Sequence, residues 1–343
     1  MIIRSRAPLR LGLAGGGTDL ASYYKNFGGA VFNACIGMYA YCSIIPTDDG
    51  MIEFIAYDNQ NNERLKSEPK LEIHENVLIL HKGVYNRIVK DYNNGQPLSF
   101  IMSTSNDAPI GSGLGTSSTM LVAILEAFDK WLGLGLSNYE KAWLAYDIER
   151  NDLGLKGGKQ DQYAAVFGGF NLMEFKQDDS VVVNSLRVER QHINELECSI
   201  NLYYCGVSRS SSDIISQQIK NTENKNEKTL EAMHFLKESA YKIKDYVLTG
   251  KFTNFANLLK QTWEQKKRTS SVITNPQIEK VIDFVMNNGA EAVKTSGAGG
   301  GGFLLVYSNP INRQKLLDSM KSLPGKVYPV KFSKTGVESW IIN

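Results

Sequence analysis

The feature that most constrains this chain is a glycine-rich segment placed between an apolar strand and an apolar helix. Residues 109–118 read Pro-Ile-Gly-Ser-Gly-Leu-Gly-Thr-Ser-Ser, with glycine at alternate positions. That spacing lets the backbone approach an anion closely and direct N–H groups at it, while the N-terminus of the next helix adds partial positive charge. The hydroxyls at its end suit phosphate oxygens or Mg²⁺. The segment therefore predicts a phosphate-binding loop; a tight turn that ends in a Ser/Thr helix cap is the alternative.

Two common nucleotide-binding loops do not match this segment. No Gly-Lys-Ser/Thr follows the glycines, so it is not a Walker A loop. Thr116 stands where a dinucleotide fingerprint would have its third glycine. The loop is therefore expected to hold phosphate in a different arrangement.

Two further clusters contain many of the chain's 30 glycines. Residues 297–302 hold five glycines in six positions and precede a buried strand. This much conformational freedom exceeds the needs of a structural loop, so the cluster is expected to close over a phosphate from the opposite side. The other cluster, residues 15–17, is followed by Thr18 and Asp19. A hydroxyl and a carboxylate there suit hydrogen bonding to a polyol, whereas a helix N-cap is their alternative use.

Hydrophobic patterning predicts a mixed chain in which strands and helices do not alternate as regular βαβ units, which favours α+β. Strands are expected over 2–13, 29–46, 51–57, 98–104, 170–175, 181–187, 200–207 and 302–307, with further strands at the C-terminus. Helices are expected over 76–93, 116–132, 137–151, 159–168, 210–267, 276–288 and 311–322. The length of 343 residues suggests about two domains, which we divide as residues 1–185 and 186–343.

Composition excludes several classes of partner. The 38 Lys and Arg nearly balance the 36 Asp and Glu, so a nucleic-acid partner is not expected. No apolar run approaches the ~18 residues that span a bilayer, and charges interrupt the N-terminus where an export signal would be apolar. The four cysteines form no C-x-x-C pair and the four histidines no i, i+4 pair, so zinc is not expected either. These features favour a reduced, cytoplasmic protein.

The three glycine clusters, in this order and at these distances, resemble those of the GHMP kinases, the family of galactokinase, homoserine kinase and mevalonate kinase. The resemblance implies an ATP- and Mg²⁺-dependent phosphotransferase with a two-domain α+β fold. Its N-terminal domain would resemble domain 2 of ribosomal protein S5, its C-terminal domain would be ferredoxin-like, and the active site would lie in the cleft between them. The ATP phosphates would contact Pro109, Gly111, Ser112, Gly113, Leu114, Gly115, Thr116, Ser117, Ser118, Gly297 and Gly299.

The resemblance also directs attention to two carboxylates twelve positions apart, Glu149 and Asp161. A hydroxyl nucleophile needs a carboxylate to accept its proton, and Asp161 is the candidate. Mg²⁺ prefers hard oxygen ligands, which Glu149 and Ser118 (or Ser117) would supply. Arg10 lies at the family's position for a cation near the reacting groups, and Lys159 is a second candidate cation beside Asp161.

In the family, the segment that contains the first glycine cluster and the Thr-Asp pair after it binds the acceptor and determines which acceptor is used. Galactokinases carry an acidic residue and a histidine before Thr-Asp, where this chain has Gly16 and Gly17. The segment is more similar to bacterial D-glycero-D-manno-heptose 7-phosphate kinases and to the kinase part of fucokinases, which usually carry a large extra domain. The expected reaction phosphorylates the anomeric hydroxyl of heptose 7-phosphate, on the way to nucleotide-activated heptose for surface polysaccharide. Alternatives are another sugar-1-kinase, an inactive sensor of this fold, or a plain nucleotide-binding module.

An acceptor that already carries phosphate requires a second anion site. Arg209 with the serines that follow it is one candidate, and the run Lys266–Arg268 is another, unless that run is a solvated helix face. Expected acceptor contacts are Gly16, Gly17, Thr18, Asp19, Arg209 and Lys266. The partners expected are therefore small molecules, for a monomer or homodimer.

Overall fold

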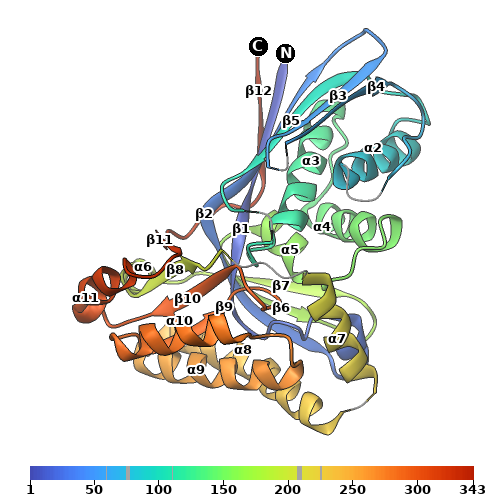
Figure 1. Ribbon diagram of the computed structural model, residues 1–343. Coiled ribbons are helices and arrows are strands. Elements are labelled where there is room, and N and C mark those ends of the chain that lie inside the picture. Colours follow the sequence, from blue (N-terminus) through green and yellow to red (C-terminus); the bar gives the residue numbers. More distant parts are fainter. Residues whose placement is uncertain (59, 75–77, 110, 207–210, 225) are drawn as a thin grey trace.

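The computed structural model describes residues 1–58, 60–74, 78–109, 111–206, 211–224 and 226–343, which form two β-sheets with helices packed on them (Figure 1). Within these residues the larger sheet has eight strands, in the order β12-β1-β2-β5-β3-β4, with β6 and β7 continuing from the other half of β2. The strands are β1 (Ile2–Ala14), β2 (Gly29–Pro46), β3 (Met51–Ala56), β4 (Asn61–Lys66), β5 (Phe100–Asn106), β6 (Phe170–Phe175), β7 (Val181–Leu186) and β12 (Glu338–Ile342). Only β3 and β5 pair in parallel among them.

Strand β2 organises this sheet because it is long enough to serve two neighbours along one edge. Its residues 40–46 pair with β5, and its residues 29–34 pair with β6. Its other edge pairs with β1, where the register shifts between Pro8 and Arg10 and again between Gly12 and Ala14. Such bulges bend a strand and re-aim its side chains. Arg10 therefore lies at a break in the ladder, where its backbone N–H donates to the Leu114 carbonyl, 3.2 Å away.

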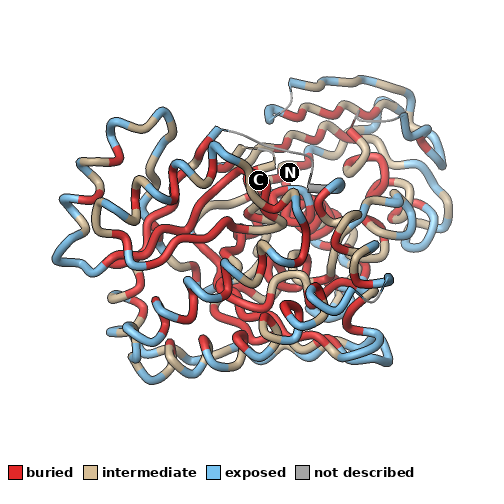
Figure 2. The backbone as a smooth tube through the Cα atoms, turned by 60° about the horizontal axis from the view of Figure 1, so that its bottom comes forward, coloured by how far each residue is buried: buried red, intermediate tan, exposed pale blue. Residues whose placement is uncertain are grey.

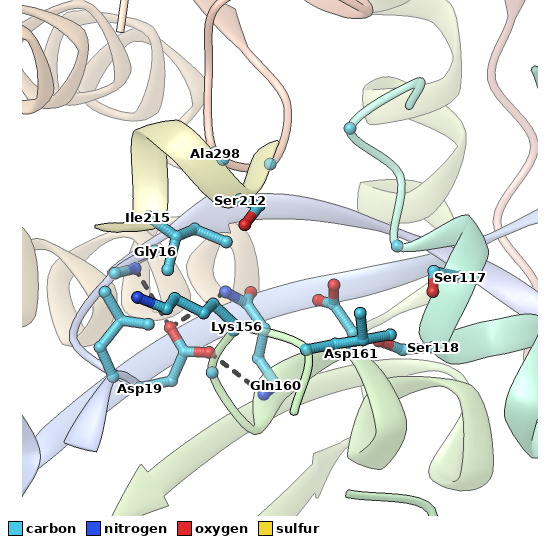
Figure 3. Close-up of a pocket in the computed structure, with 18 of the residues that line it drawn as sticks. Gly16, Asp19, Ser117, Ser118, Lys156, Gln160, Asp161, Ser212, Ile215 and Ala298 are labelled. Atoms are coloured by element: carbon cyan, nitrogen blue, oxygen red, sulfur yellow. Dashed lines mark hydrogen bonds between the residues drawn. The ribbon is translucent and has the colours of Figure 1, made fainter. Parts of the chain in front are cut away.

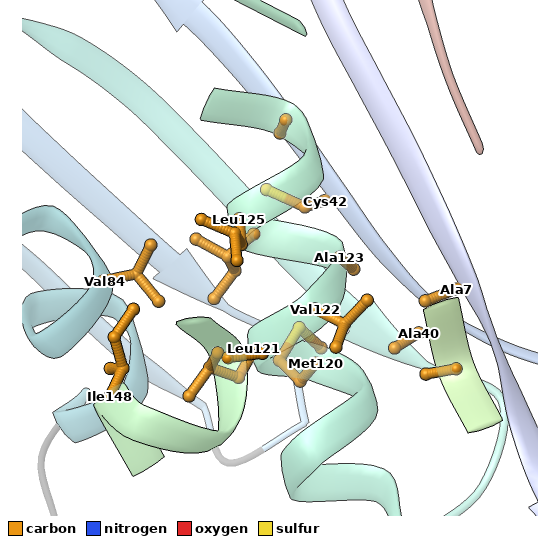
Figure 4. Close-up of a cluster of buried hydrophobic side chains, with 14 of the residues drawn as sticks. Ala7, Ala40, Cys42, Val84, Met120, Leu121, Val122, Ala123, Leu125 and Ile148 are labelled. Carbon is orange, nitrogen blue, oxygen red and sulfur yellow. The ribbon is translucent and has the colours of Figure 1, made fainter. Parts of the chain in front are cut away.

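Helix α3 (Thr116–Leu132) forms the centre of the N-terminal core. Its apolar side chains, among them Leu121, Val122 and Leu125, pack between the sheet and the neighbouring helices (Figure 4). Around it lie α2 (Ile79–Tyr92), α4 (Asn138–Asp147), the π-helical turn η1 (Ile148–Asp152) and α5 (Gln160–Phe167). Ser137 caps α4 through a capping box with Glu140. This packing fixes the first turn of α3, where Thr116, Ser117 and Ser118 supply the hydroxyls at the end of the glycine-rich loop.

The second sheet is antiparallel and has the order β11-β8-β10-β9. Its strands are β8 (Ile200–Tyr204), β9 (Ala292–Thr295), β10 (Phe303–Tyr307) and β11 (Lys326–Pro329). The remaining helices are α1 (Ala21–Phe27), α6 (Arg190–Ser199), α7 (Ser211–Glu223), α8 (Glu227–Thr249), α9 (Phe252–Thr269), α10 (Pro276–Asn287) and α11 (Pro310–Met320). Helices α8 and α9 pack side by side, with buried faces toward the sheets and exposed outer faces (Figures 1 and 2). One apolar cluster joins Leu9 of β1 to Leu202 of β8 and Leu259 of α9, so the two sheets share a core.

Most elements expected from hydrophobic patterning are present, with differences at short elements and at helix breaks. The patterning missed α1, α6, β4 and β9, which are short or alternate weakly. The helical region expected over 210–267 is divided into α7, α8 and α9, and the break between α8 and α9 occurs where Gly250 ends α8 in a left-handed conformation. Strand β12 pairs with β1, so the last residues of the chain return to the first sheet (Figure 1). The division at residue 185 remains a prediction. None of the helices in the described residues is long and apolar enough to cross a membrane.

Candidate active site

A cavity of about 460 Å³ lies where the three glycine clusters meet. Gly16 and Gly17 of the first cluster, Gly111, Gly113 and Gly115 of the second, and Gly297 of the third all line it. Among the described residues its lining carries four cations and three carboxylates: Arg10, Arg150, Lys156 and Lys266, with Asp19, Glu149 and Asp161. Folding thus brings together residues from both halves of the chain (Figure 3).

Arg10 and Asp161 form a two-pronged ion pair in the middle of the cavity. Arg10 Nε donates to Asp161 Oδ1 at 2.7 Å, and Nη2 donates to Oδ2 at 3.1 Å. The third prong, Nη1, donates to the Gly113 carbonyl at 2.6 Å. The guanidinium is buried, whereas the Asp161 side chain keeps about a fifth of its surface exposed. Arg10 therefore orients both the carboxylate and the phosphate loop, and Asp161 faces the open space.

The third glycine cluster supports the phosphate loop. Ser296 Oγ donates to the Gly113 carbonyl at 3.0 Å, and the Phe303 N–H donates to the Ser112 carbonyl at 2.9 Å. Gly113 has φ +78°, and a Cβ there would lie 2.5 Å from the Ser296 carbonyl oxygen. The glycines of both loops therefore allow two backbones to touch. Gly297 lines the cavity, whereas Gly299 packs against Ile273, away from its expected phosphate contact.

A buried lysine binds the segment just before the first glycine cluster to the second sheet. Lys294 on β9 donates through Nζ to the carbonyls of Gly12 at 3.0 Å and Leu13 at 3.1 Å. Burial lowers its pKa well below the usual range, and the nearby positive charges of Lys266 and Arg10 act in the same direction. Strand β9 thereby holds the end of β1 through Lys294, and Ser296, the residue after β9, holds the glycine-rich loop of residues 109–118.

Glu149 of η1 is a buried carboxylate that lies against the start of helix α3. Its oxygens accept hydrogen bonds from Ser118 Oγ at 2.6 Å, Ser117 Oγ at 3.1 Å and Gln162 Nε2 at 2.5 Å. The π-helical turn η1 places it there, where the sequence predicted a plain helix through residue 151. These hard oxygen donors fit Mg²⁺, which is commonly held by one or two carboxylates together with substrate phosphates. No group of three or more His, Cys, Asp or Glu residues suited to a metal occurs in the described part of the chain.

Asp19 is buried at the opposite side of the cavity (Figure 3). It accepts hydrogen bonds from the Gly17 N–H at 3.1 Å, the Gln160 N–H at 3.2 Å and Gln160 Nε2 at 3.1 Å. Burial, with the Asp161 carboxylate nearby, raises the pKa of Asp19 above its usual range, although the backbone N–H donors oppose the shift. Gly158 leaves the room for it, since a Cβ there would lie 1.8 Å from Asp19 Oδ2.

Two predicted site residues, Thr18 and Lys159, direct their polar groups to partners outside the cavity. Thr18 is fully buried, and its Oγ1 hydrogen-bonds to the carbonyls of Gly15 and Ala30, so it shapes the first loop without lining the cavity. Lys159 Nζ donates to the carbonyl and to Oδ1 of Asp179, both at 2.8 Å. The structure thus does not bring the Lys159 charge beside Asp161. Arg209 lies outside the described residues.

The side chains of the predicted basic run Lys266–Arg268 on α9 point in different directions. Lys266 lines the cavity and hydrogen-bonds to the Gly297 carbonyl. Lys267 pairs with Glu264 at 2.9 Å, and Arg268 with Glu231 at 3.0 Å, both on the outer surface. Burial and the nearby charge of Arg10 lower the pKa of Lys266 to about 8, although Asp19 and Asp161 oppose the shift. The solvated-face interpretation therefore holds for two of the three residues.

The structure adds two cations that the sequence did not single out. Arg150 Nη1 donates to the Leu155 carbonyl at 3.2 Å and Nη2 to the Gly158 carbonyl at 3.3 Å. Nη2 also lies 3.5 Å from Glu149 Oε2. Lys156, in the loop between η1 and α5, lines the cavity as well. The sequence signal for Lys156 was the glycine-containing segment Leu155-Lys156-Gly157-Gly158, which ends three residues before Asp161.

A smaller cavity of about 200 Å³ adjoins the first, and Thr116 and Ser117 line both. Its other lining residues are Ala56, Asp58, Leu78, Ile79, Leu80, His81, Thr104, Asn106 and Met120. Burial lowers the pKa of His81 to about 4, so the ring is neutral, and its Nε2 lies 2.8 Å from Thr104 Oγ1. An apolar hollow with a few polar groups, next to a phosphate loop, suits a flat heterocycle.

Known proteins share these features. The model of the GHMP kinases N-terminal domain matches residues 80–169, and that of the GHMP kinases C-terminal domain matches residues 243–324. A Campylobacter jejuni subsp. jejuni serotype O:2 protein, D-glycero-alpha-D-manno-heptose 7-phosphate kinase, is 43% identical over 99% of both chains. The chain belongs to the GHMP kinases. Membership confirms the two-domain α+β fold expected from its motifs and makes the protein a phosphotransferase that uses ATP.

Other relatives of this GHMP kinase differ in how much of their length it covers. A crystal structure described as a D-glycero-D-manno-heptose 1-phosphate kinase from Bacteriodes thetaiotaomicron is 44% identical, with a TM-score of 0.85 over 99% of both chains. The L-fucokinase/L-fucose-1-P guanylyltransferase of Bacteroides fragilis is 26% identical over 90% of this chain, which spans 34% of that protein. The chain therefore matches the heptose kinases along nearly their whole length and the fucokinase over a third of it.

Proposed function

We propose that this GHMP kinase transfers the γ-phosphoryl group of ATP to the anomeric hydroxyl of D-glycero-D-manno-heptose 7-phosphate, giving the 1,7-bisphosphate. The observation that carries the proposal is the 43% identity to the Campylobacter heptose 7-phosphate kinase along 99% of both chains. The cavity agrees with it, since its lining combines a phosphate loop, a central carboxylate and an excess of cations. The product would supply nucleotide-activated heptose for surface polysaccharide, made in the cytoplasm.

The donor would lie along the second glycine cluster. The ATP phosphates would receive N–H groups of residues 111–115 and the partial positive charge at the start of α3, and the base would enter the smaller cavity that Thr116 and Ser117 also line. Mg²⁺ would be held by Glu149 and Ser118, where it would neutralise charge on the phosphates. The hydroxyls of Ser117 and Ser118 both contact the Glu149 carboxylate, so these oxygens are adjacent.

The acceptor would occupy the space between Asp161 and Asp19. Asp161 would accept the proton of the anomeric hydroxyl, and Arg10 would hold Asp161 in place while stabilising negative charge on the transferring phosphoryl group. Asp19, fixed by Gln160, would accept hydrogen bonds from sugar hydroxyls. The glycines at 16 and 17 leave the first loop without side chains that would fill this space.

A second candidate acceptor is heptose 1-phosphate, because the Bacteriodes structure is described as a heptose 1-phosphate kinase. Both acceptors give the same bisphosphate, so identification of the product does not distinguish them. Under the first proposal the sugar enters with its anomeric carbon at Asp161, and under the second with its C7 hydroxyl there.

An acceptor panel with ATP tests the proposal. Heptose 7-phosphate, heptose 1-phosphate, unphosphorylated heptose, L-fucose and D-galactose would be compared by kcat/KM from ATP consumption. We expect heptose 7-phosphate to be preferred over unphosphorylated heptose by about 10- to 100-fold, the value of one or two charged hydrogen bonds. Preference for heptose 1-phosphate would establish the second candidate, and preference for fucose or galactose would overturn both.

Lys266 is expected to stabilise substrate binding while reducing the stability of the free protein. Its pKa of about 8 lies below its ordinary value, so the unfolded chain binds more protons between pH 8 and 10.5 and stability rises with pH across that window. Lys266→Met should raise the free energy of unfolding at pH 7 by about 1–3 kcal/mol, and by less at pH 10. It should also weaken binding of the phosphorylated acceptor. Urea unfolding at both pH values measures the first effect and steady-state kinetics the second.

Lys267→Met is the matched control on the same helix, because Lys267 pairs with Glu264 at the surface. Its unfolding free energy should change by less than about 1 kcal/mol at either pH. A Lys266→Met protein that is destabilised equally at pH 7 and pH 10 would show that the lysine acts as a packing element and not as a buried charge.

A further inference from the structure

Among the described residues that line the cavity, Lys156 is the cation whose ammonium forms no hydrogen bond or ion pair within the protein. Arg10 is bound to Asp161, Arg150 to two backbone carbonyls, and Lys266 to the Gly297 carbonyl. Lys156 lines the same cavity, is exposed, and makes no hydrogen bond or ion pair with any residue that the structure describes. A solvated ammonium that faces a binding cavity can take up a ligand anion without first breaking a contact inside the protein.

The loop that carries Lys156 is nevertheless held in place. The Leu155 N–H donates to the Glu149 carbonyl at 3.1 Å, and Arg150 bonds the carbonyls of Leu155 and Gly158 on either side of the lysine. Gly157 permits this, since a Cβ there would lie 2.2 Å from Arg150 Nη2. The main chain of Lys156 is therefore fixed relative to Asp161, which follows five residues later.

Lys156 lies at the end of the cavity away from the phosphate loop. Figure 3 shows its side chain on the side of Gly16 and Asp19, facing Ser212 and Ile215 of α7, whereas Ser117 and Ser118 lie on the opposite side with Asp161 between. An acceptor whose reacting hydroxyl is at Asp161 would direct its far end toward this part. This end is also close to Lys266, because a Cβ on Gly16 would lie 3.8 Å from Lys266 Nζ.

We propose that Lys156 binds the phosphate group that the acceptor already carries and so makes the enzyme selective for a sugar phosphate over the parent sugar. This inference rests on the proposed function. The four cations and three carboxylates among the described lining residues nearly cancel before substrate enters, whereas a phosphomonoester adds about −1.5 to −2 charges. The ammonium of Lys156 supplies positive charge at the end of the cavity where that phosphate would lie, and Ser212 supplies a hydroxyl on the facing wall.

Steady-state kinetics of Lys156→Met with heptose 7-phosphate and with unphosphorylated heptose test the proposal. Methionine keeps the length of the apolar stem and removes the charge. We expect KM for heptose 7-phosphate to rise about 10- to 100-fold, with kcat, KM for ATP and KM for unphosphorylated heptose changed less than about threefold. Lys156→Arg should recover most of the loss, because it restores the charge.

Two further variants sharpen the result. Lys242→Met removes an exposed lysine of α8 outside the cavity and should leave both KM values unchanged. Gly16→Asp introduces a carboxylate near Lys266 at a position without positive φ and with no closer neighbour, so the protein should fold. It should raise KM for the phosphorylated acceptor more than for the parent sugar.

The outcomes separate this inference from the proposed function. If the wild type prefers heptose 7-phosphate but Lys156→Met leaves its KM unchanged, or raises both KM values equally, the inference alone is overturned. If the wild type prefers a different sugar phosphate, the proposed function fails. The effect of Lys156→Met on the KM of that compound, relative to its effect on the KM of the parent sugar, then decides the inference. If the wild type uses only unphosphorylated sugars, both are overturned.

Discussion

Replacing Asp161 by asparagine is expected to lower kcat by about 10²–10⁴-fold, the usual contribution of a positioned general base. Asparagine has nearly the same shape and can still accept a hydrogen bond from Arg10, but it cannot take the proton of the acceptor hydroxyl. Because Asp161 lies beside the phosphate loop and not within it, the Kd of ATP should stay within about threefold of the wild-type value. Kinetics with heptose 7-phosphate and calorimetric ATP binding measure the two quantities.

The pairing of Asp161 with Arg10 is compatible with this role. Two guanidinium hydrogen bonds from Arg10 hold both carboxylate oxygens of Asp161 in fixed positions. Phosphoryl transfer has a loose transition state, in which the nucleophile needs orientation more than early deprotonation. We therefore expect Asp161 to hold the hydroxyl in line and to accept its proton as the new bond forms.

Asp179→Asn is the matched control for this variant. Asp179 also accepts hydrogen bonds from a cation, Lys159, but it does not line the cavity. Its replacement should leave kcat near the wild-type value. Full activity of Asp161→Asn would exclude Asp161 as the base, whereas equal loss in both variants would assign the effect to general destabilisation.

Replacing Arg10 by methionine is expected to lower kcat by about 10³–10⁵-fold, the range found when an arginine that stabilises a transferring phosphoryl group is removed. The three prongs of Arg10 hold both oxygens of Asp161 and the Gly113 carbonyl. Its loss therefore removes a cation and releases the carboxylate and the phosphate loop together. Arg10→Lys should recover only part of the activity, since an ammonium cannot reproduce the planar fork.

Strand β1 offers a control for this second prediction. Arg6 also pairs with a carboxylate, Glu338 of β12, but that pair is half-exposed and outside the cavity. Arg6→Met should leave kcat unchanged and alter stability by less than about 1 kcal/mol. The effects of Arg10→Met and Asp161→Asn should be strongly non-additive, because the two residues act as one unit. Additive effects on kcat would contradict the coupling that their geometry indicates.

The near-zero net charge of the chain has a specific consequence at this site. Positive charge for phosphate would have to be local, and under the proposed function part of it would come from backbone N–H groups of the glycine-rich loop at the start of α3. Glycine serves a second purpose that its abundance does not reveal. At Gly113 it lets two loops touch, and at Gly158 it makes room for a carboxylate.

Much of the site could be predicted from the sequence because it depends on local chemistry and order along the chain. The alternating glycines before an apolar helix indicated a functional loop, and the structure places Gly111, Gly113 and Gly115 of that loop at the cavity. The resemblance of the three clusters to the GHMP kinases singled out Arg10, Glu149 and Asp161, which the structure brings to one cavity. The α+β class followed from strands and helices that do not alternate.

The sequence could not decide which neighbouring side chain points into the cavity. Lys156 and Lys159 lie three residues apart in a segment without a regular period, and the contacts of Arg150 and Asp179 determine which lysine faces the cavity. Thr18 and Asp19 are adjacent, yet only Asp19 reaches the cavity. The direction of the Arg10 side chain depends on a bulge between β1 and β2, since a bulge re-aims the side chains of its strand. Local sequence thus determined the loops and their chemistry, whereas side-chain direction depended on long-range contacts that only the tertiary structure supplies.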